Sequence, residues 1–146
     1  MRELPRELSA EQLAELFEGR TRFVERLATV PDPLTRAETI VHELPLEEKG
    51  EILAAHPAIG QRTGLSARSA AEQGVDADPA VLEELARLNT DYEARHGFRF
   101  VVFVNRRPKA EILAVLRGRI DNATEAELET ALDELVAIAR DRWVRG

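Results

Sequence analysis

Apolar residues recur every three or four positions over most of this chain, which is the spacing of helices that bury one face. Ser9, followed three residues later by Gln12, has the form of a capping box and predicts the start of the first helix. Apolar stripes in the first part of the chain then predict four helices, at about 13–17, 23–27, 34–43 and 46–54. Because Pro57 favours an extended backbone at the residue before it, we expect His56 at the end of the fourth helix.

The middle of the chain predicts a loop, a short helix and one long helix. We expect residues 60–64 to form the loop, and Ser66 can cap the short helix that follows. Pro79 marks the start of the long helix and Gly97 marks its end. The apolar stripe of the long helix consists of Leu82, Leu85, Leu88 and Tyr92. Tyr92 is therefore expected to pack in the core.

Residues 98–104 are aromatic and β-branched and have no helical period. A single strand has no partner to pair with, so we expect an extended core segment between helices. Pro108 opens the next helix, and Thr124 with Glu127 has the form of a second capping box at the start of the closing helix. The inward positions of these two helices are Ile112, Leu113, Val115 and Leu116, then Leu128, Leu132, Leu135 and Ile138. The prediction is one all-α domain over residues 1–146, a compact helical bundle with one extended core segment.

The composition is typical of a globular protein. Its 146 residues are enough to bury a core in one domain, and 44% are hydrophobic while 32% are charged. No apolar run approaches the roughly 20 residues that a membrane-spanning helix requires. The first residues lack the apolar stretch of a secretory signal. We therefore expect a cytoplasmic protein that does not bind a membrane.

Charge and cysteine content exclude several kinds of site. The chain has no cysteine, which excludes disulfides, thiolate catalysis and cysteine-rich zinc sites. Its formal net charge of −7 argues against a broad surface for nucleic acid. No two of its three histidines have the spacing of metal ligands on a helix, so we expect no metal. A small-molecule substrate is the partner that these observations favour.

Two short segments concentrate side chains that can carry acid–base chemistry. His56 stands beside Pro57, and Ser69, Glu72 and Gln73 lie within about one helical turn of one another. The pKa of an unperturbed histidine lies near neutrality, and a carboxylate can orient the imidazole or accept a proton. These segments form a candidate acid–base site.

Four motifs that occur in order along the chain resemble a known enzyme family. They are His56-Pro57, then the Ser-x-x-Glu-Gln pattern of 69–73, then Leu-Asn-x-x-Tyr and Gly-Phe-x-Phe within 88–100, and finally Arg119 and Asn122 as Arg-x-x-Asn. The chain resembles 2-oxo-4-hydroxy-4-carboxy-5-ureidoimidazoline (OHCU) decarboxylase, which forms (S)-allantoin at the end of urate breakdown. The resemblance covers roughly residues 46–142.

The resemblance implies a compact helical bundle that is usually dimeric, and a decarboxylation that needs no metal or organic cofactor. It also implies that His56 is the catalytic histidine and that Glu72 is its carboxylate partner. The implied substrate contacts are Pro57, Ser69, Gln73, Phe100, Val101, Val102 and Arg119. We expect the polar members of this set to converge on one pocket, because decarboxylation needs a proton carrier and an anchor around one small ring.

Other interpretations of the same residues remain open. His56 can be a helix-end residue with a structural hydrogen bond, Ser69 can cap its helix, and Arg119 can be a favourable charge near a helix C-terminus. His42 and His96 match no role and are interpreted as structural. Arg99 stands where the family commonly has proline, and the family's N-terminal Trp segment is missing. An inactive helical interaction module, or a decarboxylase of a related ureido or imidazoline acid, is therefore an alternative.

Overall fold

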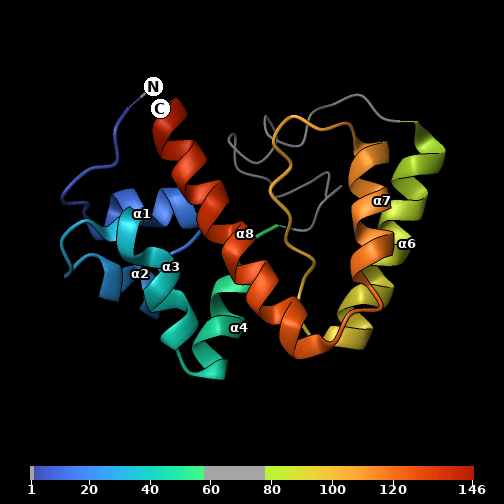
Figure 1. Ribbon diagram of the computed structural model, residues 1–146, viewed down its shortest axis with the longest axis horizontal. Helices are drawn as coiled ribbons and strands as arrows, with labels where there is room; N and C mark the ends of the chain where they lie inside the picture. The colour runs from blue at the N-terminus through green and yellow to red at the C-terminus, as the bar shows by residue number, and fades with distance from the viewer. Residues whose placement is uncertain (1, 58–77) are drawn as a thin grey trace. The chain divides into compact units, whose positions relative to one another are not determined.

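The structure is a computed structural model that describes residues 2–57 and 78–146. Every regular element in these two ranges is a helix, as predicted, and no strand occurs in them (Figure 1). The helices are α1 (Ala10–Phe17), α2 (Arg22–Leu27), α3 (Pro33–Glu43), α4 (Leu46–Ala55), α6 (Pro79–His96), α7 (Lys109–Arg119) and α8 (Thr124–Arg145). The predicted loop at 60–64 and the helix after Ser66 lie outside the described residues. No helix in the described ranges is long and apolar enough to cross a membrane.

Backbone contacts divide the chain into two compact units. The first comprises residues 1–56 and 132–146, and the second comprises residues 57–131. The early part of α8 therefore belongs to the second unit and its later part to the first. The predicted single domain over residues 1–146 stays a prediction.

The first unit begins with the predicted capping box. Gln12 donates its backbone N–H to the Ser9 hydroxyl at 3.1 Å, and the Gln12 side chain accepts from the Ser9 N–H at 2.9 Å. Phe17 of α1 packs edge-on against Phe23 of α2, with ring centroids 5.2 Å apart. Arg142 of α8 donates to the Leu16 carbonyl oxygen at 2.9 Å, so α8 is bonded to the end of α1. These contacts join α1, α2 and the later part of α8.

The second unit is built on α6 and α7, which pack against each other, and on the extended segment between them. Gly97 ends α6 in the left-handed conformation, with φ at 80°, which glycine adopts without steric strain. Alternate residues of the following segment then enter the core formed with α6 and α7. These are Phe100, Val102 and Val104, with Phe98 partly buried against the same core. The packing of alternate residues in one core is the pattern of an extended chain, so the predicted extended core segment is confirmed.

The second predicted capping box is wrong. Thr124 is the first residue inside α8, and the Glu127 N–H donates to the Ala123 carbonyl oxygen at 2.9 Å. The Thr124 hydroxyl contacts Nδ1 of His96 at 2.7 Å, and Glu127 turns into the protein interior with only 1% exposure. The helix starts one residue earlier than the pattern suggested, so these two side chains are released for long-range contacts. Three positions that were expected to face inward, Leu82, Val115 and Leu128, are only half-buried.

Candidate active site

His56 occupies the position that the sequence predicted, directly after the last residue of α4. Its backbone is extended, with φ −83° and ψ 139°, and its N–H donates to the Leu53 carbonyl oxygen at 3.2 Å. The side chain is buried, with 6% exposure. Pro57, which imposes the extended backbone, is half-buried. A buried imidazole at the end of a helix is a suitable proton carrier.

The end of α4 is held in the first unit by two kinds of contact. A Cβ built at Gly19 would lie 3.3 Å from the Cβ of Ala55, so glycine permits the close approach of this loop to the helix end. On an earlier turn, Glu51 accepts the Arg22 N–H at 2.8 Å. The residue before His56 is therefore closely packed.

Three of the other predicted site residues, Ser69, Glu72 and Gln73, lie outside the described residues. Their convergence with His56 and Arg119 on one pocket stays a prediction. The remaining ones, Phe100, Val101, Val102 and Arg119, belong to the second unit.

Arg119 lies in the last turn of α7 and is buried, with 9% exposure. Its Nη1 donates to the Val101 carbonyl oxygen at 2.9 Å, and its Nε donates to Oε1 of Glu127 at 2.9 Å. The guanidinium carbon lies 4.7 Å from the centre of the Phe100 ring. The structure thus brings together three predicted residues, Phe100, Val101 and Arg119. Phe100 and Val102 also pack in the core of the second unit.

Glu127 is the centre of a hydrogen-bond network that the sequence did not predict. Its Oε1 accepts from the Tyr92 hydroxyl at 2.5 Å as well as from Arg119, and its Oε2 accepts from Nδ2 of Asn122 at 3.0 Å. The four side chains come from α6, α7, the turn after α7, and α8. We call these residues, Tyr92, Arg119, Asn122 and Glu127, the arginine network.

The charges of the arginine network are fixed near neutral pH. Burial acts to raise the pKa of Glu127, but the hydrogen bonds from Tyr92 and Asn122 and the charge of Arg119 outweigh it and lower that pKa below its usual value. Burial first, and then the neighbouring Glu127 carboxylate, raise the pKa of Tyr92 well above its usual value. Glu127 therefore stays ionised while Tyr92 stays protonated.

One nitrogen of Arg119 has no hydrogen-bond partner in the part of the chain that the structure describes. Nη2 is buried and has no hydrogen-bond acceptor, and it is the one arginine nitrogen of this kind among the described residues. Leaving a buried donor unsatisfied costs about 1–3 kcal/mol, and more for a charged group. A ligand oxygen at this position would recover that cost. The arrangement is suited to anchoring a small molecule by a carbonyl or carboxylate oxygen.

Neither of the other two histidines joins this network. His96 is buried in the second unit, where Nδ1 contacts the Thr124 hydroxyl at 2.7 Å and Nε2 donates to the Ile120 carbonyl oxygen at 2.9 Å. Its ring lies 4.5 Å from that of Tyr92. These contacts agree with the structural role expected from the sequence.

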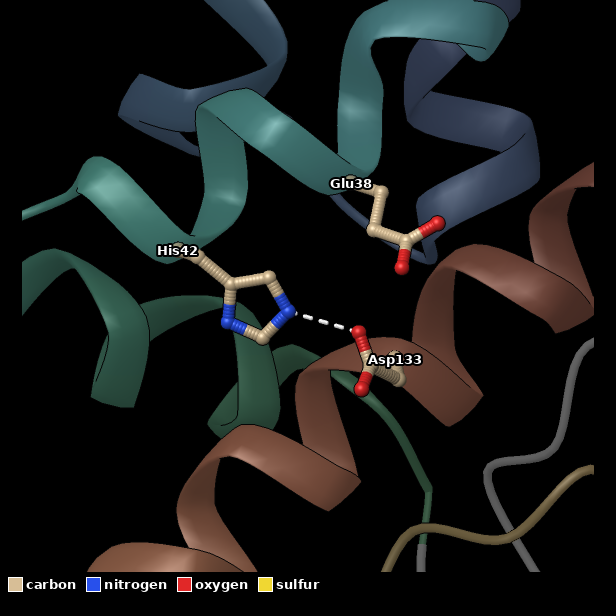
Figure 2. Close-up of side chains that lie close together, drawn as sticks. All are labelled: Glu38, His42 and Asp133. Carbon is tan, nitrogen blue, oxygen red and sulfur yellow. Dashed lines mark hydrogen bonds and ion pairs between the residues drawn. The ribbon is translucent and has the colours of Figure 1, made fainter.

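His42 belongs to an exposed cluster in the first unit with Glu38 and Asp133 (Figure 2). His42 and Asp133 meet at 2.6 Å between Nε2 and Oδ1, which links α3 to α8. The three groups offer ligand atoms within 4.8 Å of one another, as a metal site would. However, Arg140 already lies 3.6 Å from Glu38, and the Glu38 and Asp133 side chains are at least half exposed. We interpret the cluster as a surface ion-pair group that joins two helices.

Comparison with known proteins identifies the family. The family model described as OHCU decarboxylase matches residues 2–144. The chain belongs to the OHCU decarboxylase family. The resemblance inferred from the four motifs is therefore confirmed, and the match extends beyond them into the N-terminal helices.

Individual relatives agree with this assignment. The chain is 32% identical over 127 residues to the OHCU decarboxylase of Haloferax volcanii, covering 84% of this chain and 76% of that protein. It is 34% identical over 103 residues to that of Halalkalicoccus jeotgali, covering 68% of this chain and 58% of that protein. A crystal structure of OHCU decarboxylase in the presence of (S)-allantoin superposes with a TM-score of 0.75 at 25% identity, covering 92% of this chain and 96% of that chain. The all-α fold is thus the family's fold.

Proposed function

We propose that this protein is a carboxy-lyase of urate breakdown that decarboxylates OHCU to (S)-allantoin, with His56 and Glu72 as its acid–base pair. The observation that carries the proposal is the family match over residues 2–144. The buried Arg119, with a nitrogen left for a ligand oxygen, supports it independently, because an interaction module has no need of a buried guanidinium with one unsatisfied nitrogen.

The chemistry needs no cofactor. The bond between the ring carbon and its carboxylate breaks, CO₂ leaves, and the electron pair is delocalised into the adjacent carbonyl or imine of the substrate itself. The hydroxyl on the same carbon loses its proton and becomes a carbonyl, and a proton must then be added on one face of the neighbouring ring carbon, which carries the ureido group. His56 supplies this proton in the proposal, and Glu72 orients the imidazole or accepts the proton of the substrate hydroxyl.

Arg119 is proposed to bind the ring oxygen or the ureido carbonyl rather than the departing carboxylate. A bond to the departing carboxylate would stabilise the bound substrate. Such stabilisation does not raise the rate unless the transition state is stabilised more than the substrate. A guanidinium aimed at an oxygen that gains negative charge stabilises the transition state directly. Pro57, Ser69, Gln73 and the segment Phe100 to Val102 complete the proposed substrate contacts.

We further propose that the enzyme works in the cytoplasm, and that it is a homodimer, as the family resemblance implies. Sedimentation velocity at micromolar concentration measures the oligomeric state. A species with twice the mass of the chain supports the dimer, whereas a monomer at every concentration contradicts it.

A coupled assay tests the proposed activity. Urate oxidase and hydroxyisourate hydrolase generate the substrate in the cuvette, and its disappearance is followed with and without this protein. We expect the wild type to accelerate the loss well beyond the spontaneous rate. His56→Ala is expected to lose about 10²–10⁴ in rate, which is the usual contribution of a general acid–base group.

His42→Ala is the matched control, because it removes a histidine of the same unit that lies in an exposed ion pair. It is expected to keep the wild-type rate. A wild type that leaves the spontaneous rate unchanged would contradict the activity. Equal rates for His56→Ala and the wild type would leave the activity standing and overturn the role of His56.

A further inference from the structure

We propose that Glu127 is a positioning residue, which fixes the Arg119 guanidinium so that Nη2 is presented to a carbonyl oxygen of the ligand. The proposal rests on the proposed function, in which Arg119 contacts the substrate. Glu127 itself touches no ligand in this account. It acts through Arg119, which it contacts at 2.9 Å.

The geometry of the guanidinium explains how two bonds can aim a third nitrogen. The group is planar and its nitrogens diverge in fixed directions. Glu127 holds Nε and the Val101 carbonyl oxygen holds Nη1, while the Phe100 ring lies against the group. Because two of its nitrogens are bonded, the plane of the guanidinium group and its rotation within that plane are fixed. The direction of Nη2 therefore follows without any contact of its own.

The carboxylate is held as firmly as the guanidinium. Tyr92 donates to Oε1 from α6, and Asn122 donates to Oε2 from the turn after α7. Glu127 is 1% exposed, so the bonds are shielded from competing water. A carboxylate bonded by both of its oxygens cannot rotate to follow a displaced arginine. The network is preorganised, which is the condition under which a buried dipole or charge assists catalysis.

A buried arginine with a purely structural role is expected to have no buried nitrogen without a hydrogen-bond partner. In the first unit, Arg142 is buried against Glu18 at 3.0 Å and donates to the Leu16 carbonyl oxygen. No nitrogen of Arg142 is among the buried unpartnered atoms, whereas Nη2 of Arg119 is. A protein that needed Arg119 for stability alone would gain by satisfying Nη2 as well. The unsatisfied nitrogen therefore indicates a ligand contact, and Glu127 is the residue that directs it.

The test compares Glu127→Gln with Glu18→Gln, because each removes the negative charge opposite a buried arginine. Both variants are expected to lose thermal stability. Only Glu127→Gln is expected to lower kcat/KM per folded molecule in the coupled assay, by about 10²-fold, which is the effect of small misplacements at a catalytic site. The loss should lie at least partly in a raised KM, since Arg119 anchors the substrate. Glu18→Gln should keep both constants within about twofold of wild type.

A second measurement does not depend on turnover. (S)-Allantoin is titrated into each protein while the Arg119 Nε–Hε resonance is followed by NMR. We expect saturable binding to the wild type and to Glu18→Gln, and at least tenfold weaker binding to Glu127→Gln. If the wild type turns over but the two variants behave alike in both measurements, Glu127 is not a positioning residue and the proposed function survives.

The opposite pattern separates the two proposals. If the wild type shows no turnover but binds (S)-allantoin in a manner that depends on Glu127, the proposed function fails and the positioning role stands. If there is neither turnover nor Glu127-dependent binding, both are overturned.

Discussion

Each of the two units contains a buried arginine paired with a glutamate, and the protein uses the two arginines differently. Arg142, in the last turn of α8, bonds the Leu16 carbonyl oxygen and Glu18. Arg119, in the last turn of α7, bonds the Val101 carbonyl oxygen and Glu127, but its Nη2 has no hydrogen-bond partner among the described residues. Both arginines are buried, charged and in the last turn of a helix. They differ in that, within the described ranges, Arg119 has a buried nitrogen without a hydrogen-bond partner, whereas no such nitrogen occurs in Arg142.

This difference between the two arginines separates a buried charge that serves the fold from one that is available to a ligand. The Leu16 carbonyl belongs to the end of α1, where helix carbonyls lack a partner within the helix, so Arg142 fulfils a structural need there. Val101 lies in an extended segment, and the network around Arg119 ends on an unbonded donor. Burial of an ion pair is expensive and is weak evidence for stability by itself. The unbonded donor is what distinguishes a ligand site from a structural pair.

The largest expected effect comes from Arg142→Ala. Removing one partner of a buried ion pair leaves the other charge uncompensated, and this costs about 3–5 kcal/mol. We expect the free energy of unfolding, measured by urea denaturation, to fall by that amount. The kcat/KM of the molecules that remain folded should be unchanged. A specific loss of kcat/KM in this variant would break the comparison, because it would assign a functional role to the structural arginine.

Arg119→Lys tests the same comparison at the arginine that is proposed to contact the ligand. Lysine keeps the positive charge but replaces three diverging nitrogens with one ammonium, so it cannot bond Val101 and Glu127 and also aim at a ligand. We expect kcat/KM to fall by about 10²-fold. Arg142→Lys is the control and should retain kcat/KM. Full activity in Arg119→Lys would contradict the directed role of Nη2.

The response to acid provides a third, smaller contrast. The pKa of Glu127 is lowered in the folded protein, so its ionised form contributes stability that is fully present above the unfolded pKa, near 4.5. That contribution is lost as the pH falls through the lower folded value. Glu127→Gln should therefore show a shallower decline of unfolding free energy below about pH 4.5. Identical slopes for the variant and the wild type would contradict the lowered pKa.

The smallest effect is expected at the exposed cluster. Asp133→Asn breaks the ion pair with His42, but Asp133 is half exposed and water screens the interaction. Such pairs contribute about 0–1 kcal/mol. The free energy of unfolding should therefore fall by at most about 1 kcal/mol, and kcat/KM should not change. Both quantities follow from one denaturation curve and one kinetic assay. A loss of activity would show that the cluster belongs to a functional site.

The sequence predicted the features that depend on local chemistry. The Ser9 capping box, the extended His56 before Pro57 and the end of α6 at Gly97 each follow from a few neighbouring residues, and each is confirmed. The extended core segment at residues 98–104 follows from their aromatic and β-branched character in the same way.

The arginine network could not be predicted because its bonds join distant residues. Glu127 is a polar residue near a helix start, where a capping role is the ordinary expectation, yet Tyr92 bonds it from 35 positions away. Arg119 and Arg142 also look alike in sequence, since both are cations in the last turn of a helix. Only the partners of their nitrogens, which are set by tertiary packing, separate them.

The most direct test of the account is the handedness of the product. Water can protonate either face of the intermediate, so the spontaneous reaction gives racemic allantoin, whereas one proton donor on one face imposes a single hand. Circular dichroism of the product from the coupled reaction measures this. We expect optically active (S)-allantoin with the wild type and a signal that falls toward zero with His56→Ala. Racemic product in the presence of the wild type would contradict the account.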